Sequence, residues 1–217
     1  MPRYAAAIFD LDGTLLDTER LSIDAGLLTL NTLGHTVSRS FMESLVGMAE
    51  SEGQRRLTAH IGAEIDLITL EADWGAHTRR LFAQGIPLMP GVSDLLAHLQ
   101  AATLPHAVAT NSSTQNARRK LTEAGLSHHF APHHIVGYDA VARAKPAPDV
   151  FLEAAARLGV APADCVAFED SEAGVIAALA AGMTVVQIPD MQPAATSNAH
   201  YLAPSLLHGA RACGLMT

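Results

Sequence analysis

The sequence is poor in several features that mark specialised proteins. Only two cysteines occur among its 217 residues, so we expect no disulfide framework. No run of Lys and Arg is longer than the three residues 118–120, and the formal net charge is -8. We expect that short basic run to lie on a solvated helix face. Nucleic acid is not the expected partner, because binding to a phosphate backbone usually needs a basic face.

The chain also lacks a long hydrophobic run. Its longest apolar stretch, residues 175–189, is broken by Gly182, Thr184 and Gln187 and does not predict a membrane span. The apolar run at 5–9 is too short for a secretory signal and is followed at once by two aspartates. With 49% hydrophobic and 17% charged residues, the composition is typical of a globular protein. We expect a soluble cytoplasmic protein, and a monomer is compatible with this sequence.

Short apolar runs alternate with helical patterns along most of the chain. Each run is typical of a strand that is buried on both faces, and the intervening segments repeat apolar residues at helical spacing. This alternation predicts an α/β fold with a doubly wound parallel sheet, a Rossmann-like core with helices on both faces. The predicted strands are residues 5–9, 105–109, 134–137, 165–168 and 184–188.

Residues 18–86 interrupt this rhythm, because they contain helical patterns and no convincing strand. We interpret this segment as an all-helical cap domain inserted between the first two strands. The predicted domains are therefore a discontinuous α/β core, residues 1–17 and 87–217, and a cap, residues 18–86.

Polar residues follow the predicted strands, where ligands bind in open α/β sheets. Asp10 and Asp12 end the first run, and side chains two residues apart in a strand point the same way. Thr110 and Asn111 end the second run ahead of a helix, whose free N–H groups suit a phosphate. Each motif also has an ordinary interpretation, a capped Asp-Gly turn for the first and a Ser N-cap for the second.

Two later motifs add a positive charge and two further carboxylates to the predicted site. Lys145 stands before two prolines and could neutralise a phosphoryl group at the mouth of the sheet. Glu169 and Asp170 follow the fourth run and offer the hard oxygen ligands that suit Mg²⁺. An acidic helix N-terminus would explain the last pair equally well. The order of the four motifs, each after a predicted strand, is far more specific than any one of them.

These motifs resemble those of the haloacid dehalogenase-like superfamily, in its group with a small helical cap that includes β-phosphoglucomutases and phosphoglycolate phosphatases. The resemblance covers nearly the whole chain. It implies a phosphatase in which Asp10 is the nucleophile, Asp12 is the general acid and base, and Lys145 balances charge. It also implies that the residues that hold the phosphoryl oxygens are Thr110, the Asn111 backbone and Lys145. The implied Mg²⁺ ligands are Asp10, the Asp12 backbone carbonyl, Glu169 and Asp170.

The substrate implied is a small phosphorylated metabolite, such as a sugar phosphate, and the implied intermediate is an aspartyl phosphate. A phosphosugar mutase is the main alternative. The β-phosphoglucomutases carry a histidine early in the cap and an arginine after a Gly-Val-Ser-like turn. The matching stretches here, residues 17–22 and 46–50, contain neither, and Ser22 occupies the histidine position. A non-enzymatic phospho-acceptor domain is a remote alternative, because such domains are shorter and lack a cap.

Overall fold

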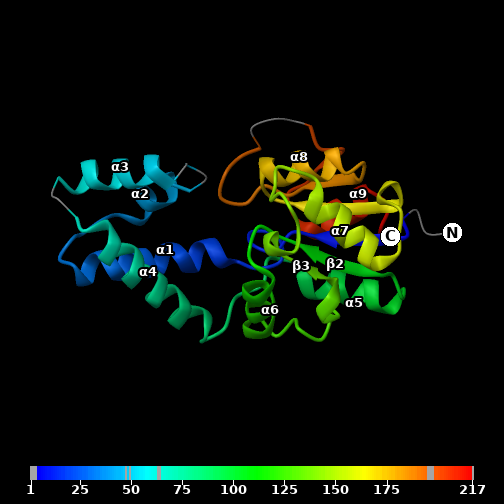
Figure 1. Ribbon diagram of the computed structural model, residues 1–217, viewed down its shortest axis with the longest axis horizontal. Coiled ribbons are helices and arrows are strands. Elements are labelled where there is room, and N and C mark those ends of the chain that lie inside the picture. The colour runs from blue at the N-terminus through cyan, green and yellow to red at the C-terminus, as the bar shows by residue number, and fades with distance from the viewer. Residues whose placement is uncertain (1–3, 47, 49, 63–64, 195–197, 217) are drawn as a thin grey trace. The chain divides into compact units, whose positions relative to one another are not determined.

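The computed structural model describes residues 4–46, 48, 50–62, 65–194 and 198–216. Contacts between residues divide the chain into two compact units, residues 1–17 with 87–217 and residues 18–86. Figure 1 labels the helices of both units and strands β2 and β3 of the first. Within the described residues, no helix is long and apolar enough to cross a membrane. The cytoplasmic location stays a prediction.

The first unit contains a six-stranded parallel sheet, which confirms the predicted α/β fold. The strand order is β3-β2-β1-β4-β5-β6, so the direction of winding reverses at β1 and β4. β1 and β4 are buried along their whole length, as expected for strands that are apolar except for Glu169 at the end of β4. The strands are β1 (Ala6–Phe9), β2 (His106–Ala109), β3 (Ile135–Val136), β4 (Cys165–Glu169), β5 (Thr184–Gln187) and β6 (Tyr201–Leu202).

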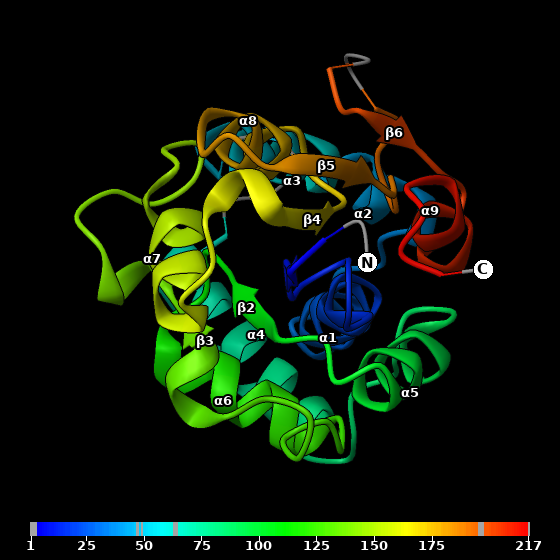
Figure 2. The same ribbon diagram turned by 90° about the vertical axis from the view of Figure 1, so that its right-hand side faces the viewer.

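Helices cover both faces of this sheet (Figure 2). α7 packs against α8 on one face, and α5 packs against α9 on the other. Short 3₁₀ turns at Pro132–His134, Tyr138–Ala140 and Pro162–Asp164 complete the connections. The core helices are α5 (Val92–Ala101), α6 (Thr114–Glu123), α7 (Asp149–Leu158), α8 (Glu172–Ala180) and α9 (Leu206–Ala212).

The edges of the sheet differ from the sequence-based expectation. β3 comprises two residues instead of the four predicted at 134–137, because Pro132–His134 forms a 3₁₀ turn that occupies the start of that run. β6 and α9 were not predicted. β6 has only two residues, too few for a periodic pattern, and it pairs with β5 from the opposite end of a long loop. Its pairing is therefore a tertiary contact that no local pattern signals.

The second unit consists, in its described part, of helices α1 (Thr18–Thr32), α2 (Arg39–Ser44), α3 (Glu50–Ile61) and α4 (Leu67–Phe82). α1 and α4 form its main packing contact. Trp74 of α4 donates its indole N–H to the Ser22 carbonyl oxygen at 2.7 Å. Gly26 of α1 lies under the Trp74 ring, where a Cβ atom would come within 2.5 Å of Cζ2. Glycine thus permits the close approach of the two helices.

This close approach yields a prediction for Gly26→Ala. The added methyl group should push the Trp74 ring away and lower the free energy of unfolding of this unit by about 1–3 kcal/mol. Because Trp74 is the only tryptophan, its fluorescence reports the change directly. Gly53→Ala in α3 is the matched control, since its Cβ would meet no atom within 4 Å. The control should gain about 0.5–1 kcal/mol from higher helix propensity. Equal stability of the two variants would contradict the packing argument.

Candidate functional site

The pairing of β1 with β4 brings two acidic residues together at the carboxyl ends of the strands. Phe9 is in register with Phe168, and their rings stack at a centroid distance of 5.1 Å. The ladder continues one step further, because the Asp10 N–H donates to the Phe168 carbonyl oxygen at 2.9 Å. Asp10 therefore lies beside Glu169. This position is next to the reversal in strand order, where open α/β sheets bind their ligands.

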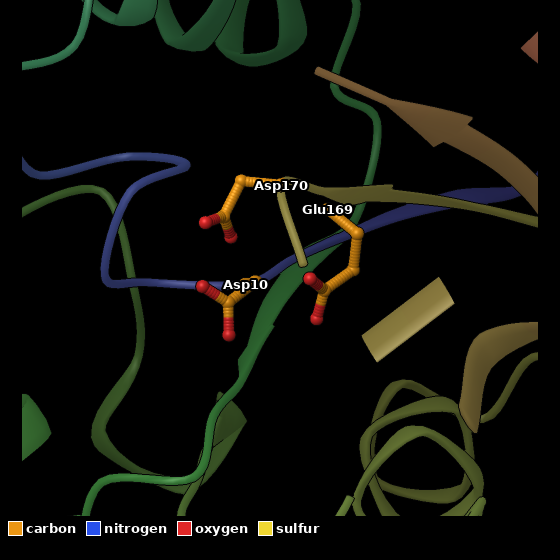
Figure 3. Close-up of side chains that lie close together, drawn as sticks. All are labelled: Asp10, Glu169 and Asp170. Atoms are coloured by element: carbon orange, nitrogen blue, oxygen red, sulfur yellow. The ribbon is translucent and has the colours of Figure 1, made fainter. Parts of the chain in front are cut away.

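Asp10, Glu169 and Asp170 form an acidic cluster, and Figure 3 shows their carboxylates turned toward one another. One oxygen from each of the three lies within 4.8 Å of the others. Asp10 and Glu169 are buried, and Asp170 is half-buried. Thr14 donates its hydroxyl to Asp170 Oδ1 at 3.2 Å and so orients that carboxylate. The hydroxyl and backbone N–H of Ser171 donate to Glu169 Oε2 at 3.0 and 3.2 Å.

Lys145 supplies the positive charge at this cluster. Its Nζ lies 2.6 Å from Asp10 Oδ1 and 2.6 Å from Glu169 Oε1, and it is 4.8 Å from the centroid of the Phe151 ring. Burial lowers the pKa of Lys145, but the two carboxylates outweigh burial and raise that pKa above its ordinary value. The ammonium therefore stays protonated between its two partners.

One ammonium does not neutralise three neighbouring carboxylates. Burial, together with the charges of Glu169 and Asp12, raises the pKa of Asp10 to about 8, although Lys145 acts in the opposite direction. Crowded carboxylates of this kind are relieved by a proton or by a cation. Three hard oxygen donors in one small space are a ligand set that Mg²⁺ accepts. The residues present therefore fit the divalent cation that the sequence predicts.

Two glycines allow the acidic side chains to pack so closely against the backbone. Gly13 has a φ of 83°, and a Cβ on it would approach Asp170 Oδ2 to 2.5 Å. A Cβ on Gly174, in the first turn of α8, would lie 1.8 Å from Glu169 Oε1. No other residue type fits either position without moving a carboxylate.

Asp12 has different partners from Asp10. Its carboxylate accepts hydrogen bonds from Lys120 Nζ at 2.7 and 2.8 Å and from the Ser112 hydroxyl at 2.9 Å. Although the sequence pattern predicts it, Asp10 and Asp12 do not share one face of a strand, because β1 ends at Phe9 and the chain then turns. The side chain of Asp12 is not part of the acidic cluster found among the described residues. Its backbone carbonyl as a metal ligand stays a prediction.

Thr110 and Asn111 lie where the sequence places them, after β2, but part of the expected helix N-terminus is occupied. The Thr114 N–H donates to Asp139 Oδ1 at 2.7 Å, and Ser113 is an ordinary N-cap. The buried Thr110 hydroxyl accepts the Ser112 N–H at 3.0 Å. The side chain of Asn111 has a role that the sequence pattern does not indicate. Its Oδ1 accepts the Lys145 N–H at 2.9 Å, and its Nδ2 donates to the Lys145 carbonyl oxygen at 3.3 Å.

Residues 7–188 match the family described as haloacid dehalogenase-like hydrolase. A protein of Drosophila melanogaster named a probable pseudouridine-5'-phosphatase is 36% identical over 89% of this chain and 85% of its own length. The fructose-1-phosphate phosphatase YqaB of Escherichia coli is 35% identical, over 86% of this chain and 97% of its own. The β-phosphoglucomutase of Bacillus subtilis is 34% identical over 87% of this chain and 84% of its own length.

Solved structures are similar as well. A hydrolase of the same superfamily from Deinococcus radiodurans, crystallised with phosphate and sodium, is 28% identical and has a TM-score of 0.81 over 100% of this chain and 99% of that chain. The protein CbbY from Rhodobacter sphaeroides, in complex with phosphate, is 30% identical. Its TM-score is 0.71 over 93% of this chain and 94% of that chain.

The ion pairs of Lys145 yield a stability prediction. Lys145→Met keeps the length of the side chain but leaves Asp10 and Glu169 buried without their cation. Such a loss costs about 3–5 kcal/mol of the free energy of unfolding. The measurement is urea unfolding at neutral pH with a chelator present, so that no metal ion replaces the ammonium. Arg143→Met, which removes an exposed ion pair with Asp149, is the control and should leave the midpoint nearly unchanged. A Lys145→Met protein as stable as the control would contradict this account.

Proposed function

The chain belongs to the haloacid dehalogenase-like hydrolases, and from this membership we propose that it removes phosphate from a small sugar-like monoester through an aspartyl-phosphate intermediate. It is a phosphoric monoester hydrolase that acts on small phosphorylated metabolites. The observation that carries the mechanism is the buried contact of Asp10 with Lys145 beside Glu169 and Asp170. This arrangement offers one nucleophile in a setting that neutralises phosphoryl charge.

In the first half-reaction, an Asp10 carboxylate oxygen attacks phosphorus and the bond from phosphorus to the ester oxygen breaks. The leaving oxygen takes a proton from Asp12, so an alcohol departs instead of an alkoxide. Lys145 and the Thr110 hydroxyl, with the Asn111 backbone N–H, hold the phosphoryl oxygens. The Asn111 side chain keeps Lys145 in place through two hydrogen bonds to its backbone.

In the second half-reaction, Asp12 takes a proton from a water molecule that attacks the phospho-aspartate. Inorganic phosphate leaves, and Asp10 is free again. Asp12 thus serves as acid and then as base, which requires its carboxylate to point toward the same place in both steps. Its position two residues after the nucleophile, in a turn held by the Gly13 N–H to the Leu16 carbonyl oxygen at 2.8 Å, supports this role.

Asp10 and Asp170 are the carboxylates best placed to hold Mg²⁺ directly. Lys145 and Ser171 already engage both oxygens of Glu169, which favours a contact through water for that residue. When bound, a divalent cation supplies charge neutralisation for the nucleophile and the phosphoryl oxygens. It also favours the ionised form of Asp10, whose pKa is otherwise raised.

Phosphatase activity is favoured over mutase activity by the cap. A mutase must protect its phospho-enzyme from water, and the histidine and arginine of the β-phosphoglucomutases have no counterpart here. Ser22, at the histidine position, lines a cavity of about 290 Å³ with Glu19 and apolar residues that include Trp74. In the stretch expected to carry the arginine, positions 47 and 49 lie outside the described residues. Relatives named for fructose 1-phosphate and pseudouridine 5'-phosphate support a sugar-like substrate.

The first functional prediction concerns the nucleophile. Asp10→Asn should lower turnover on the order of 10³-fold or more, because an amide neither attacks phosphorus nor ligates a metal as an anion. Phosphate release is measured across a panel of sugar phosphates, polyol phosphates, phosphoglycolate and nucleotides. Asp94→Asn, an exposed change in α5 with the same loss of charge, is the control. A folded Asp10→Asn protein with substantial activity would falsify the role of Asp10.

The second prediction concerns the metal. A chelator should stop phosphate release, and added Mg²⁺ should restore it. Ca²⁺ should support the reaction poorly, because its looser coordination holds the nucleophile less accurately. Isothermal titration with Mg²⁺ should also show binding to the wild-type protein and none to Asp170→Asn. Full activity in excess chelator would rule out the metal.

The third prediction separates the hydrolase from the mutase. Glucose 1-phosphate, if accepted, should yield free phosphate without a positional isomer, because nothing delays the attack of water on the phospho-enzyme. Phosphorus NMR follows both products in one sample. Glucose 6-phosphate accumulating faster than inorganic phosphate would establish the mutase instead.

A further inference from the structure

Lysine is rare in this chain, and both lysines contact acidic residues of the site. Lysine occupies only positions 120 and 145, whereas arginine supplies the other twelve of the fourteen basic side chains. Lys145 holds Asp10 and Glu169. Lys120 is part of no motif that the family resemblance identified, and yet its Nζ contacts the carboxylate of Asp12. The sequence alone placed Lys120 on a solvated face, but its side chain is only 14% exposed.

Three groups form what we call the Asp12 clamp: the side chains of Lys120, Ser112 and Asp12 itself. Lys120 Nζ lies 2.7 Å from Asp12 Oδ1, 2.8 Å from Oδ2 and 3.0 Å from Ser112 Oγ. The Ser112 hydroxyl donates to Asp12 Oδ2 at 2.9 Å. The three contacts of Nζ equal the number of N–H groups on an ammonium. The longer, planar guanidinium of arginine does not offer three donors from one nitrogen atom.

The stability of the fold does not explain this arrangement. A largely buried ion pair is weak evidence for stability, because desolvation of the two charges offsets their attraction, and ordering a long side chain costs rotamer freedom. What the clamp does is fix the orientation of the Asp12 carboxylate. A carboxylate held by donors on both oxygens cannot rotate freely, so it presents the same edge to a leaving oxygen and later to a water molecule.

We propose that Lys120 is a positioning residue for acid and base catalysis by Asp12. The proposal rests on the proposed function, in which Asp12 protonates the leaving group and then activates water. Lys120 holds the Asp12 carboxylate in one rotamer through both half-reactions and does not itself contact the substrate. Ser112 contributes the second hydrogen bond of the same clamp.

The kinetic test compares Lys120→Met with Arg118→Met. Both variants lose one positive charge from α6, but Arg118 is exposed and its guanidinium donates to the Pro132 carbonyl oxygen, away from Asp12. The substrate is the fastest alkyl ester among fructose 1-phosphate, glycerol 3-phosphate and glucose 6-phosphate. Lys120→Met should lower kcat roughly 10²-fold, the effect of a small misplacement of a catalytic group. KM should change by less than about threefold, since substrate binding is not involved. Arg118→Met should match the wild type.

A substrate whose leaving group needs no proton distinguishes the loss of a positioned acid from a general structural effect of the substitution. p-Nitrophenolate departs without a proton, so the first turnover of p-nitrophenyl phosphate should be as fast in Lys120→Met as in the wild type. The later turnovers should be slow, because water activation still needs Asp12, and a burst of p-nitrophenol should therefore appear. A first turnover slowed as much as the steady state would overturn the proposal.

A double-mutant cycle tests whether Lys120 acts through Asp12. Asp12→Asn should itself slow alkyl ester hydrolysis, and adding Lys120→Met should then cost less than about twofold. An additive loss would show that Lys120 acts elsewhere and would overturn the proposal. If Lys120→Met does not fold, Lys120→Arg replaces it, with a smaller loss that Asp12→Asn should mask in the same way.

The proposed function can fail separately from this inference. A wild-type protein that releases no phosphate from any monoester, or an Asp12→Asn variant with full activity, would contradict the proposed function. A slow Asp12→Asn variant beside a fully active Lys120→Met variant would contradict the inference alone. NMR of protein labelled with ¹³C at lysine Cε adds a readout that needs no activity. Only two side-chain signals are expected, and Asp12→Asn should shift that of Lys120, which Lys120→Met identifies. An unshifted signal would show that the clamp is absent in solution.

Discussion

The ammonium of Lys145 lies 2.6 Å from the carboxylates of both Asp10 and Glu169, and the rest of the site depends on this buried contact. Parallel pairing of β1 and β4 delivers Asp10 and Glu169 to adjacent strand ends, where burial and the nearby negative charges raise the pKa of Asp10. Lys145 comes from a loop that the Asn111 side chain holds by its backbone. Asn111, which follows β2, thus helps to position the Lys145 ammonium against Asp10 and Glu169 at the ends of β1 and β4.

The backbone around the acidic cluster has glycine at two positions where a carboxylate packs directly against it. Gly13 and Gly174 leave no space for a Cβ atom beside Asp170 and Glu169. The hydroxyls of Thr14 and Ser171 donate to one oxygen of Asp170 and to the second oxygen of Glu169. Replacing such a group of buried charges by apolar residues would often be neutral or stabilising in a protein. Their presence at the ligand-binding edge of the sheet is therefore better explained by chemistry than by folding.

The two aspartates of the first motif have different hydrogen-bond partners. Asp10 faces Lys145 and the other two carboxylates, the environment of a nucleophile that needs charge neutralisation. Asp12 is held by Lys120 and Ser112 from α6 and the loop before it, the environment of a group that must keep one orientation. Two chemically identical side chains, two residues apart, are thereby suited to different tasks.

The α/β fold and the order of the motifs follow from the sequence alone, because both depend on local patterns. Continuous apolar runs predicted four strands closely, and Asp10, Glu169 and Asp170 could be brought together by the rule that parallel strands end at one edge. The tertiary structure determines which residues contact Asp12, since Lys120 lies 108 residues away in the sequence, in a helix whose basic run is expected to face solvent. It also determines the pairing of β6 and the hold of Asn111 on Lys145. Such contacts depend on how elements pack in three dimensions, and no spacing along the chain encodes them.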